Sequence, residues 1–469
     1  MTLPTSPSHH GQATAGATWS PALWGLLFVL AGNMLIDALE VSVAIVALPA
    51  VGEDLGIAPH RLHWVVTGFA VGFGALMLFG TRVVALLGRR PVYLAALLVF
   101  AAASLASAFA DSLVPLVATR LVKGFCAALT APTGLAIIAS VFPEGRPRGR
   151  AVSVYTLFGA SGFSAGLLLS GLLTEVGWRW TFAFPAPVAL LLFLCGLRLI
   201  PRDAPDPARP RRYDAAGALT LTGGTLFLVH AVTSVPATGW ADPSTIAAFL
   251  GAAVLLPAFV RIELTARAPL IRLDLPAGRP LLRSALGAAA LNGSYLGMLL
   301  VSTVHLQRAG GWSPLQTGLA LLPASLPLAL SALHSGRLVS RFTAARLIAV
   351  GAVFPPLGYV LLLRLDTPVR YAVDVLPSML LVGAGFVLSF TALHMQATSA
   401  VPAGRQAEAS GLYQTGVQMG AVLMLALVAA VQPAGHRSAL LLVTAVGVLG
   451  LLIALGGVLP DRNRTLEER

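Results

Sequence analysis

The sequence predicts an all-helical protein that crosses a membrane many times. Hydrophobic residues make up 57% of the 469 residues and charged residues only 11%, which is far less polar than an ordinary soluble domain. Apolar runs long enough to span a bilayer as helices, about 20 residues each, follow one another along nearly the whole chain. Two acids, Asp37 and Glu40, stand inside the first of these runs. The chain therefore belongs to the class of polytopic membrane proteins.

Fourteen segments have the length and apolarity of spanning helices. They are 22–48, 62–86, 91–110, 113–141, 149–174, 181–200, 215–234, 244–261, 283–306, 315–334, 346–363, 372–398, 407–431 and 438–459. Residues 1–20 are polar, lack Lys and Arg, and run into a first helix that is too long for the core of a signal peptide.

The two halves of the chain resemble each other. FPEGR at 142–146 returns as VPAGR at 401–405, and RVVALLGRR at 82–90 returns as RLVSRFTAAR at 337–346. Parallel repeats of six helices with a substrate site between them are typical of transporters that rock about a central site. The expected division is a tail (1–21), a six-helix bundle (22–200), a linker (201–214), two inserted helices (215–261), a surface segment (262–282), a second six-helix bundle (283–459) and a tail (460–469).

The net charge of +12 comes from arginines that are concentrated in alternate loops, and it does not indicate a nucleic-acid site. Arginines gather in alternate loops, as at Arg89 and Arg90, at 146–150 and at 202–212, whereas the opposite loops carry few. Because cytoplasmic loops hold the excess of Lys and Arg, both termini are expected in the cytoplasm. A cell membrane location with a lipid bilayer as surroundings, and no nucleic-acid partner, follows.

The acids of the first segment point to a function. An ionisable side chain in hydrocarbon is costly, so such residues usually face a cavity and serve transport or proton movement. Asp37 and Glu40 share one helix face, and the fourth segment carries Arg120 and Lys123, the only lysine, at comparable depths. The sequence thus predicts two stacked pairs, Glu40 with Arg120 and Asp37 with Lys123. We expect a proton-coupling centre of Glu40, Asp37 and Arg120, in which Glu40 titrates and Asp37 mainly balances Lys123; the alternative is a static structural ion pair.

Three further residues are candidates for substrate binding. Lys123 either binds an anionic substrate or neutralises Asp37, because a buried charge needs a partner. Asn292 and Tyr295, on the ninth segment, provide polar groups for the wall of a cavity in the second half.

Several motifs resemble the fourteen-helix drug/proton antiporter branch of the major facilitator superfamily. EVSVAIVALP at 40–49 is similar to the motif of its first helix, and RLVKGFCAA at 120–128 to that of its fourth. GWRWTFAFPAP at 177–187, GWSPLQTGLALLP at 311–323 and ASGLYQTGVQMG at 409–420 match further segments of the family. The resemblance implies the major facilitator fold, with helices 7 and 8 inserted between the two bundles.

The resemblance also implies gating residues, although this chain departs from the family's motifs at some positions. The family's cytoplasmic loop motif is matched at Gly88, Arg89 and Arg90, and Arg82 in the same loop is a further gating candidate, but Ala85 replaces the motif's acid, as does Ser340 in the repeat. The arginines are therefore expected to find other partners, such as helix C-termini. The glycines of the family's fifth-helix motif are matched at Gly162, Gly166 and Gly171, but Leu167 replaces its proline.

These observations predict a secondary transporter that exports small amphipathic or hydrophobic compounds from a bacterial cytoplasm in exchange for protons. The proton gradient would supply the energy, no cofactor is expected, and the chain would act as a monomer in the inner membrane. A proton-coupled importer or facilitator of the same fold is the first alternative, and a non-transporting sensor or scaffold is the second. No phosphate-binding glycine loop or His/Cys metal spacing suggests an enzyme.

Overall fold

The computed structural model describes residues 19–58, 61–202, 214–266, 279–331, 341–399, 401–402 and 405–457. The predicted terminal tails lie outside these residues, except for 19–21, and so do Ser340 and most of the predicted linker and surface segment. The helices of the first half are α1 (Pro21–Asp54), α2 (His63–Leu87), α3 (Arg89–Ala108), α4 (Leu113–Val141), α5 (Arg146–Val176), α6 (Trp178–Ala183) and α7 (Pro185–Leu199). Next come α8 (Ala215–Thr238) and α9 (Pro243–Thr265).

The second half repeats this pattern. Its helices are α10 (Arg279–Val304) with the π-helical turn η2 (His305–Ala309), α11 (Pro314–Ser331), α13 (Ala344–Gly351), α14 (Phe354–Leu362), η3 (Tyr371–Val375), α15 (Leu376–Ser399), α16 (Gln406–Val431), η5 (Gln432–Ala434) and α17 (His436–Leu455). Thirteen helical stretches of the described residues are long and apolar enough to cross a membrane. With α11, which ends where the undescribed residues 332–340 begin, they coincide with the fourteen predicted segments.

Two predicted segments are divided in the structure. The sixth consists of α6 and α7, which meet at Phe184 just before Pro185. The eleventh divides into α13 and α14, and Pro355 and Pro356 stand in the first turn of α14. Proline lacks the backbone N–H that a continuous helix needs, so it is best tolerated where a helix begins.

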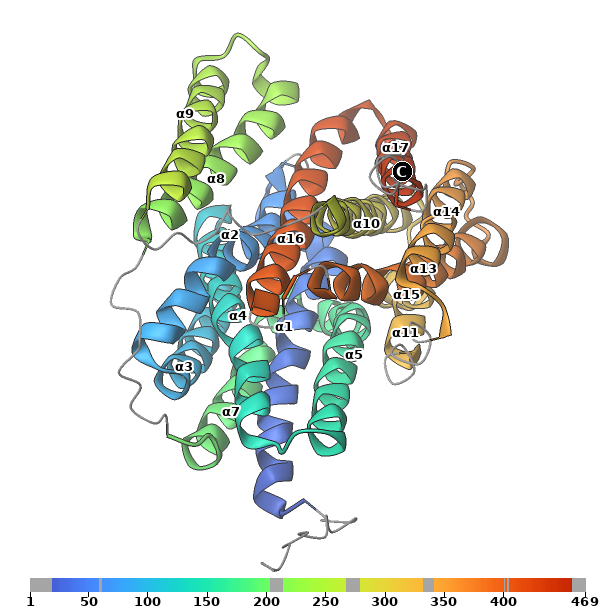
Figure 1. The fold of residues 1–469 in the computed structure, drawn as a ribbon. Helices are drawn as coiled ribbons and strands as arrows, with labels where there is room; N and C mark the ends of the chain where they lie inside the picture. Colours follow the sequence, from blue (N-terminus) through green and yellow to red (C-terminus); the bar gives the residue numbers. More distant parts are fainter. Residues whose placement is uncertain are drawn as a thin grey trace, which may run out of the picture.

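The helices form two bundles with an added pair (Figure 1). In the first bundle α1 packs on α5 and α2 on α4; in the second, α10 packs on α16 and α17, and α11 on α15. Helices α8 and α9 pair with each other at the edge of the molecule, and α8 contacts both α2 and α16. The inserted pair therefore lies against the junction of the bundles. The architecture is the major facilitator fold, with two six-helix bundles and two inserted helices.

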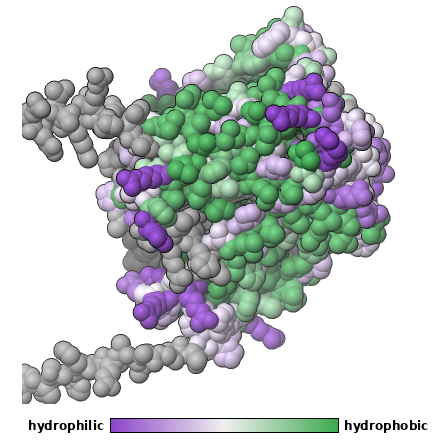
Figure 2. Space-filling view, turned by 90° about the vertical axis from the view of Figure 1, so that its right-hand side faces the viewer, coloured by the Kyte–Doolittle hydropathy of each residue, from purple (hydrophilic) through white to green (hydrophobic). Residues whose placement is uncertain are grey.

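The outer surface has the composition of a membrane-embedded one. Figure 2 shows a face covered mainly by hydrophobic residues, with hydrophilic residues gathered toward its margins. Large apolar side chains are exposed on many helices, including Leu191 on α7, Leu250 on α9 and Leu452 on α17. A soluble monomer rarely exposes so extensive an apolar surface. The chain is a multi-pass membrane protein.

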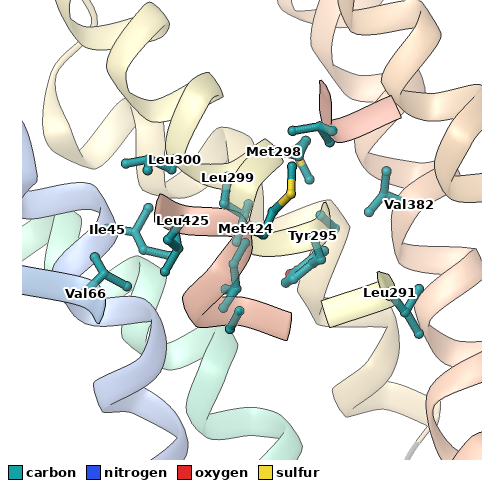
Figure 3. Close-up of a cluster of buried hydrophobic side chains, with 14 of the residues drawn as sticks. Ile45, Val66, Leu291, Tyr295, Met298, Leu299, Leu300, Val382, Met424 and Leu425 are labelled. Atoms are coloured by element: carbon teal, nitrogen blue, oxygen red, sulfur yellow. The ribbon is translucent and has the colours of Figure 1, made fainter. Parts of the chain in front are cut away.

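The two bundles meet along α5 and α11, and along α2 and α16. Near the end predicted to face outward, Gln307 donates a hydrogen bond of 3.0 Å to the carbonyl of Val46, and Ser313 donates one of 2.7 Å to Glu175. A buried apolar cluster lies between the bundles, with Ile45 of α1 beside Leu425 of α16 (Figure 3). The halves are thus in direct contact at the predicted outer end.

Candidate functional site: a buried charge centre between α1 and α4

Arg120 is held by three acceptors. Its Nη1 donates to Oε2 of Glu40, its Nη2 to the Glu40 carbonyl at 2.8 Å, and its Nε to the Val65 carbonyl at 2.9 Å. Both side chains are fully buried. The guanidinium also lies over the Phe69 ring, 4.9 Å from its centroid. Arg120 therefore joins α4 to both α1 and α2, and the predicted pair with Glu40 is present.

Lys123 pairs with the same carboxylate. Its Nζ lies 2.5 Å from Oε1 of Glu40, although the angles do not suit a hydrogen bond. The ammonium lies 5.1 Å from the centroid of the Phe100 ring and 6.0 Å from that of Phe182. Aromatic faces attract cations, more strongly where water is excluded. Glu40 is thus a carboxylate between two buried cations.

Asp37 has only neutral partners in the described part of the chain. Its Oδ2 accepts hydrogen bonds of 2.9 Å from both Asn33 and Thr130, and its buried Oδ1 has no partner. The predicted pair of Asp37 with Lys123 is therefore wrong. Depth along a helix does not fix the partner, because a lysine's long stem can carry its ammonium toward a deeper or shallower acid.

The positive and negative charges of this centre do not balance. Arg120 and Lys123 together carry two positive charges against the single negative charge of Glu40. Asp37, one turn away on α1, is the remaining acid. Ionised, it would offset the surplus positive charge; protonated, it would leave that charge uncompensated. The protonation of Asp37 consequently changes the net charge of a fully buried centre.

Asn292 and Tyr295 are placed differently from each other. Asn292 donates a hydrogen bond of 3.1 Å to the carbonyl of Val417, which ties α10 to α16. Tyr295 is buried where the bundles meet, with its ring centroid 5.5 Å from that of Phe163 on α5 and 4.8 Å from that of Phe386 on α15. Tyr295 thus lies between the halves, whereas the side-chain amide of Asn292 is engaged within its bundle. That the two residues bind substrate from a cavity wall of the second half stays a prediction.

The α5 glycines lie at close helix contacts. A Cβ at Gly162 would come 2.3 Å from the Leu35 carbonyl oxygen, and one at Gly166 would come 2.1 Å from the Ser42 hydroxyl, so both let α5 approach α1. A Cβ at Gly171 would meet the backbone of Leu315 on α11 at 2.8 Å. Gly171 therefore permits contact between the two bundles rather than within one.

The loop arginines Arg89 and Arg90 contact backbone carbonyl groups. Arg90 donates a hydrogen bond of 2.6 Å to the carbonyl of Leu197 in the last turn of α7, as expected for an arginine at a helix C-terminus. Arg89 points to the Ala136 carbonyl of α4 at 3.5 Å, which is long for a hydrogen bond. Gly88 has φ of 96°, a conformation that favours glycine, at the turn between α2 and α3.

Sequence reasoning missed the residues that complete the centre. They are Asn33 and Thr130, which bind Asp37, and the rings of Phe69, Phe100 and Phe182 around the cations. The available signal was Asn33, a polar residue in an apolar run, four positions before Asp37 and hence on its helix face.

Two six-helix bundles, the first of which holds a buried charge centre between α1 and α4, are the architecture of a membrane transporter rather than of an enzyme. The family model described as Major Facilitator Superfamily matches residues 30–425. This chain belongs to the major facilitator superfamily, and within it to the drug-efflux branch.

Named relatives and solved structures agree with this assignment. The chain is 36% identical to the puromycin resistance protein pur8 of Streptomyces alboniger, covering 86% of this chain and 80% of that one. It is 32% identical to the cephamycin export protein CmcT of Amycolatopsis lactamdurans, covering 91% and 89%. The crystal structure of the POT family transporter PepTSo superposes with a TM-score of 0.68 at 16% identity, covering 96% of this chain and 99% of that one, which shows a shared fold.

Proposed function

We propose that this transporter exports small amphipathic or hydrophobic compounds, such as antibiotics, from a bacterial cytoplasm in exchange for protons. It would lie in the inner membrane with both termini in the cytoplasm, as a monomer driven by the proton gradient. The relatives named for puromycin resistance and cephamycin export support export of such compounds. The excess of arginines in alternate loops supports the orientation.

Proton exchange is proposed at Asp37. A carboxylate is costly to bury unless it is paired, and Asp37 has hydrogen-bond donors but no cation within reach among the described residues. Glu40, in contrast, would have to separate from both Arg120 and Lys123 before it could take up a proton. Protonation of Asp37 therefore breaks fewer interactions than protonation of Glu40. This difference between the partners of the two acids is the observation that carries the proposal.

Glu40 acts in this scheme as a fixed anchor. It holds α4 to α1 through Arg120 and Lys123, and Arg120 extends the connection to α2 through Val65. The proton would leave Asp37 for water in the inward-facing cavity when substrate binds, and return from outside after substrate leaves. The two bundles would rock about α5–α11 and α2–α16, where they already touch.

An importer or facilitator of the same fold is the second candidate, and the observation favouring it is Leu167, which replaces the proline of the family's antiport motif. The two candidates differ in the direction of coupled flux. An exporter in inverted vesicles accumulates substrate when the vesicle lumen is acid, whereas a proton-coupled importer of the same orientation does not.

The test is a susceptibility and transport assay. Cells with and without the protein are compared for resistance to puromycin, lincomycin and ethidium, and inverted vesicles for ethidium uptake before and after collapse of the proton gradient. The proposal predicts added resistance and an uptake that the collapse abolishes. Unchanged susceptibility to the whole panel, together with gradient-independent ethidium uptake, would contradict it.

A further inference from the structure

The hydroxyl of Tyr93 is a buried polar group that the fold leaves without a hydrogen bond. Tyr93, near the start of α3, is completely buried, and its hydroxyl has no partner among the described residues. It belongs to a buried cluster with apolar side chains of α1, α4 and α5, among them Leu30, Ile138 and Ala151. Nearly all buried polar groups in proteins are hydrogen-bonded to protein or to ordered water. Packing alone does not explain this hydroxyl, because phenylalanine would fill almost the same space without it.

Tyr93 lies level with Thr130, the residue of α4 that binds Asp37. The helices α3 and α4 meet where the Lys123 ammonium lies 5.1 Å from the centroid of the Phe100 ring. Seven residues from each of these, toward the end predicted to face the cytoplasm, stand Tyr93 and Thr130. Seven residues are about two helical turns, or about 10 Å of rise, so both residues stay on the faces that meet. Thr130 donates a hydrogen bond of 2.9 Å to Asp37, which places Tyr93 on the α3 side of this acid.

The neighbours of Tyr93 and Asp37 show that α3 and α1 converge at this level. Ile36, just before Asp37, and Val92, just before Tyr93, are buried in one apolar cluster. Tyr93 is also near enough to Asp37 to interact with it electrostatically. Oδ1 of Asp37 is buried and, like the Tyr93 hydroxyl, has no hydrogen-bond partner among the described residues. Polar atoms left in this way are the usual partners of buried water molecules.

We propose that the Tyr93 hydroxyl, through bound water, donates a hydrogen bond toward Oδ1 of Asp37 and stabilises the ionised carboxylate. Tyr93 is then a positioning residue for the proton exchange. Hydrogen bonds to an ionised acceptor are stronger than those to a neutral one, so the contact strengthens when Asp37 loses its proton. A hydrogen bond to the charged form favours that form. Because this role depends on the proposed exchange at Asp37, it is tested by a titration that does not require transport.

Tyr155 on α5 supplies the matched control. It is also a buried tyrosine near Asp37, but its hydroxyl donates a hydrogen bond of 2.8 Å to the Ala131 carbonyl. The remaining ionisable groups around Asp37 are the same in both tyrosine variants. They stand on α1 and α4 and are Glu40, Arg120, Lys123 and Cys126.

The test is a pH titration of Asp37 in the purified full-length protein. Infrared spectroscopy follows the band of its protonated carboxyl group, which Asp37→Asn identifies by removing it. Tyr93→Phe should move the titration midpoint up by about one pH unit, because the ionised form loses a hydrogen bond. Tyr155→Phe should leave the midpoint at its wild-type value. Tyr93→Phe should fold as well as the wild type, since no hydrogen bond to another described residue is lost.

Each outcome bears on one of the two proposals or on both. An unchanged midpoint in Tyr93→Phe, or equal shifts in the two Phe variants, would overturn the role of Tyr93. Undiminished proton release from Asp37→Asn on drug binding would overturn proton exchange at Asp37 and leave the titration result standing. If Asp37→Asn removes no carboxyl band at any pH at which the protein is folded, Asp37 takes up no proton and both proposals are wrong.

Discussion

Lys123 is paired with Glu40 and not with Asp37: its Nζ lies 2.5 Å from Oε1 of Glu40, and both side chains are completely buried. Arg120 pairs with the other carboxylate oxygen, so Glu40 is paired with two cations. Asp37, in contrast, accepts hydrogen bonds only from the neutral groups of Asn33 and Thr130. Lys123 therefore does not neutralise Asp37, and we propose the proton-exchanging role for Asp37 in place of Glu40.

Glu40→Gln should destabilise the protein strongly. It leaves two buried cations without a carboxylate, and deletion of one partner of a buried ion pair costs about 3–5 kcal/mol. The measurement is thermal unfolding in detergent, followed by size-exclusion chromatography of a fluorescent fusion. Adding Lys123→Gln removes one stranded cation and should partly restore stability. A double variant no more stable than Glu40→Gln would show that Lys123 does not depend on Glu40.

Asp37→Asn should fold almost as well as the wild-type protein. The amide oxygen can still accept a hydrogen bond from Thr130 or Asn33, and no buried cation loses its partner. The same unfolding assay measures the difference, which should be much smaller than that of Glu40→Gln. Unfolding of Asp37→Asn at a temperature as low as that of Glu40→Gln would mean that Asp37 balances the cations after all.

Arg120→Gln should cost more stability than Lys123→Gln. Arg120 supplies hydrogen bonds to the Val65 and Glu40 carbonyls besides its ion pair, whereas Lys123 has only the ion pair and ring contacts. A buried acceptor left unsatisfied costs about 1–3 kcal/mol. Chemical denaturation of both variants in the same detergent compares them, and equal losses would contradict the distinction.

Gly171→Leu should open the outer contact between the bundles. Even a Cβ there would meet the Leu315 backbone at 2.8 Å, so α5 and α11 must separate. The measurement is thiol labelling of a cysteine placed at Ser313, which should become faster. Gly149→Leu is the matched control, because nothing lies within 4 Å of a Cβ at that α5 position. Equal labelling rates in the two variants would show that Gly171 does not set the contact.

Ala85→Asp should restore the acid that the family places near the loop arginines. We expect the new carboxylate to form an ion pair with Arg89 more readily than with Arg90, because the contact of Arg89 to the Ala136 carbonyl is long at 3.5 Å. A larger fraction of the variant's molecules should then be in the outward-facing state. Spin-label distances across the cytoplasmic side measure this shift; identical distance distributions in the variant and the wild type would exclude such a latch.

The helices could be predicted from sequence because a span must be about 20 apolar residues long. The pairing at the centre could not. A rise of 1.5 Å per residue gives the depth of a Cα, but a long lysine stem lets its ammonium move several ångströms along the helix axis. Depth alone predicted Lys123 beside Asp37, whereas the packing of α1 on α4 and the contact with the Phe100 ring put its ammonium beside Glu40. The Asp37–Thr130 contact, between residues 93 positions apart, likewise depends on tertiary packing.

The central claim, that Asp37 exchanges the proton, is tested most directly by proton release on substrate binding. Purified protein in weakly buffered detergent is mixed with puromycin or ethidium, and a pH-indicator dye reports the protons released. The wild type and Lys123→Gln should release protons, whereas Asp37→Asn should bind the drug and release none. Undiminished proton release from Asp37→Asn would contradict the account and return the role to Glu40.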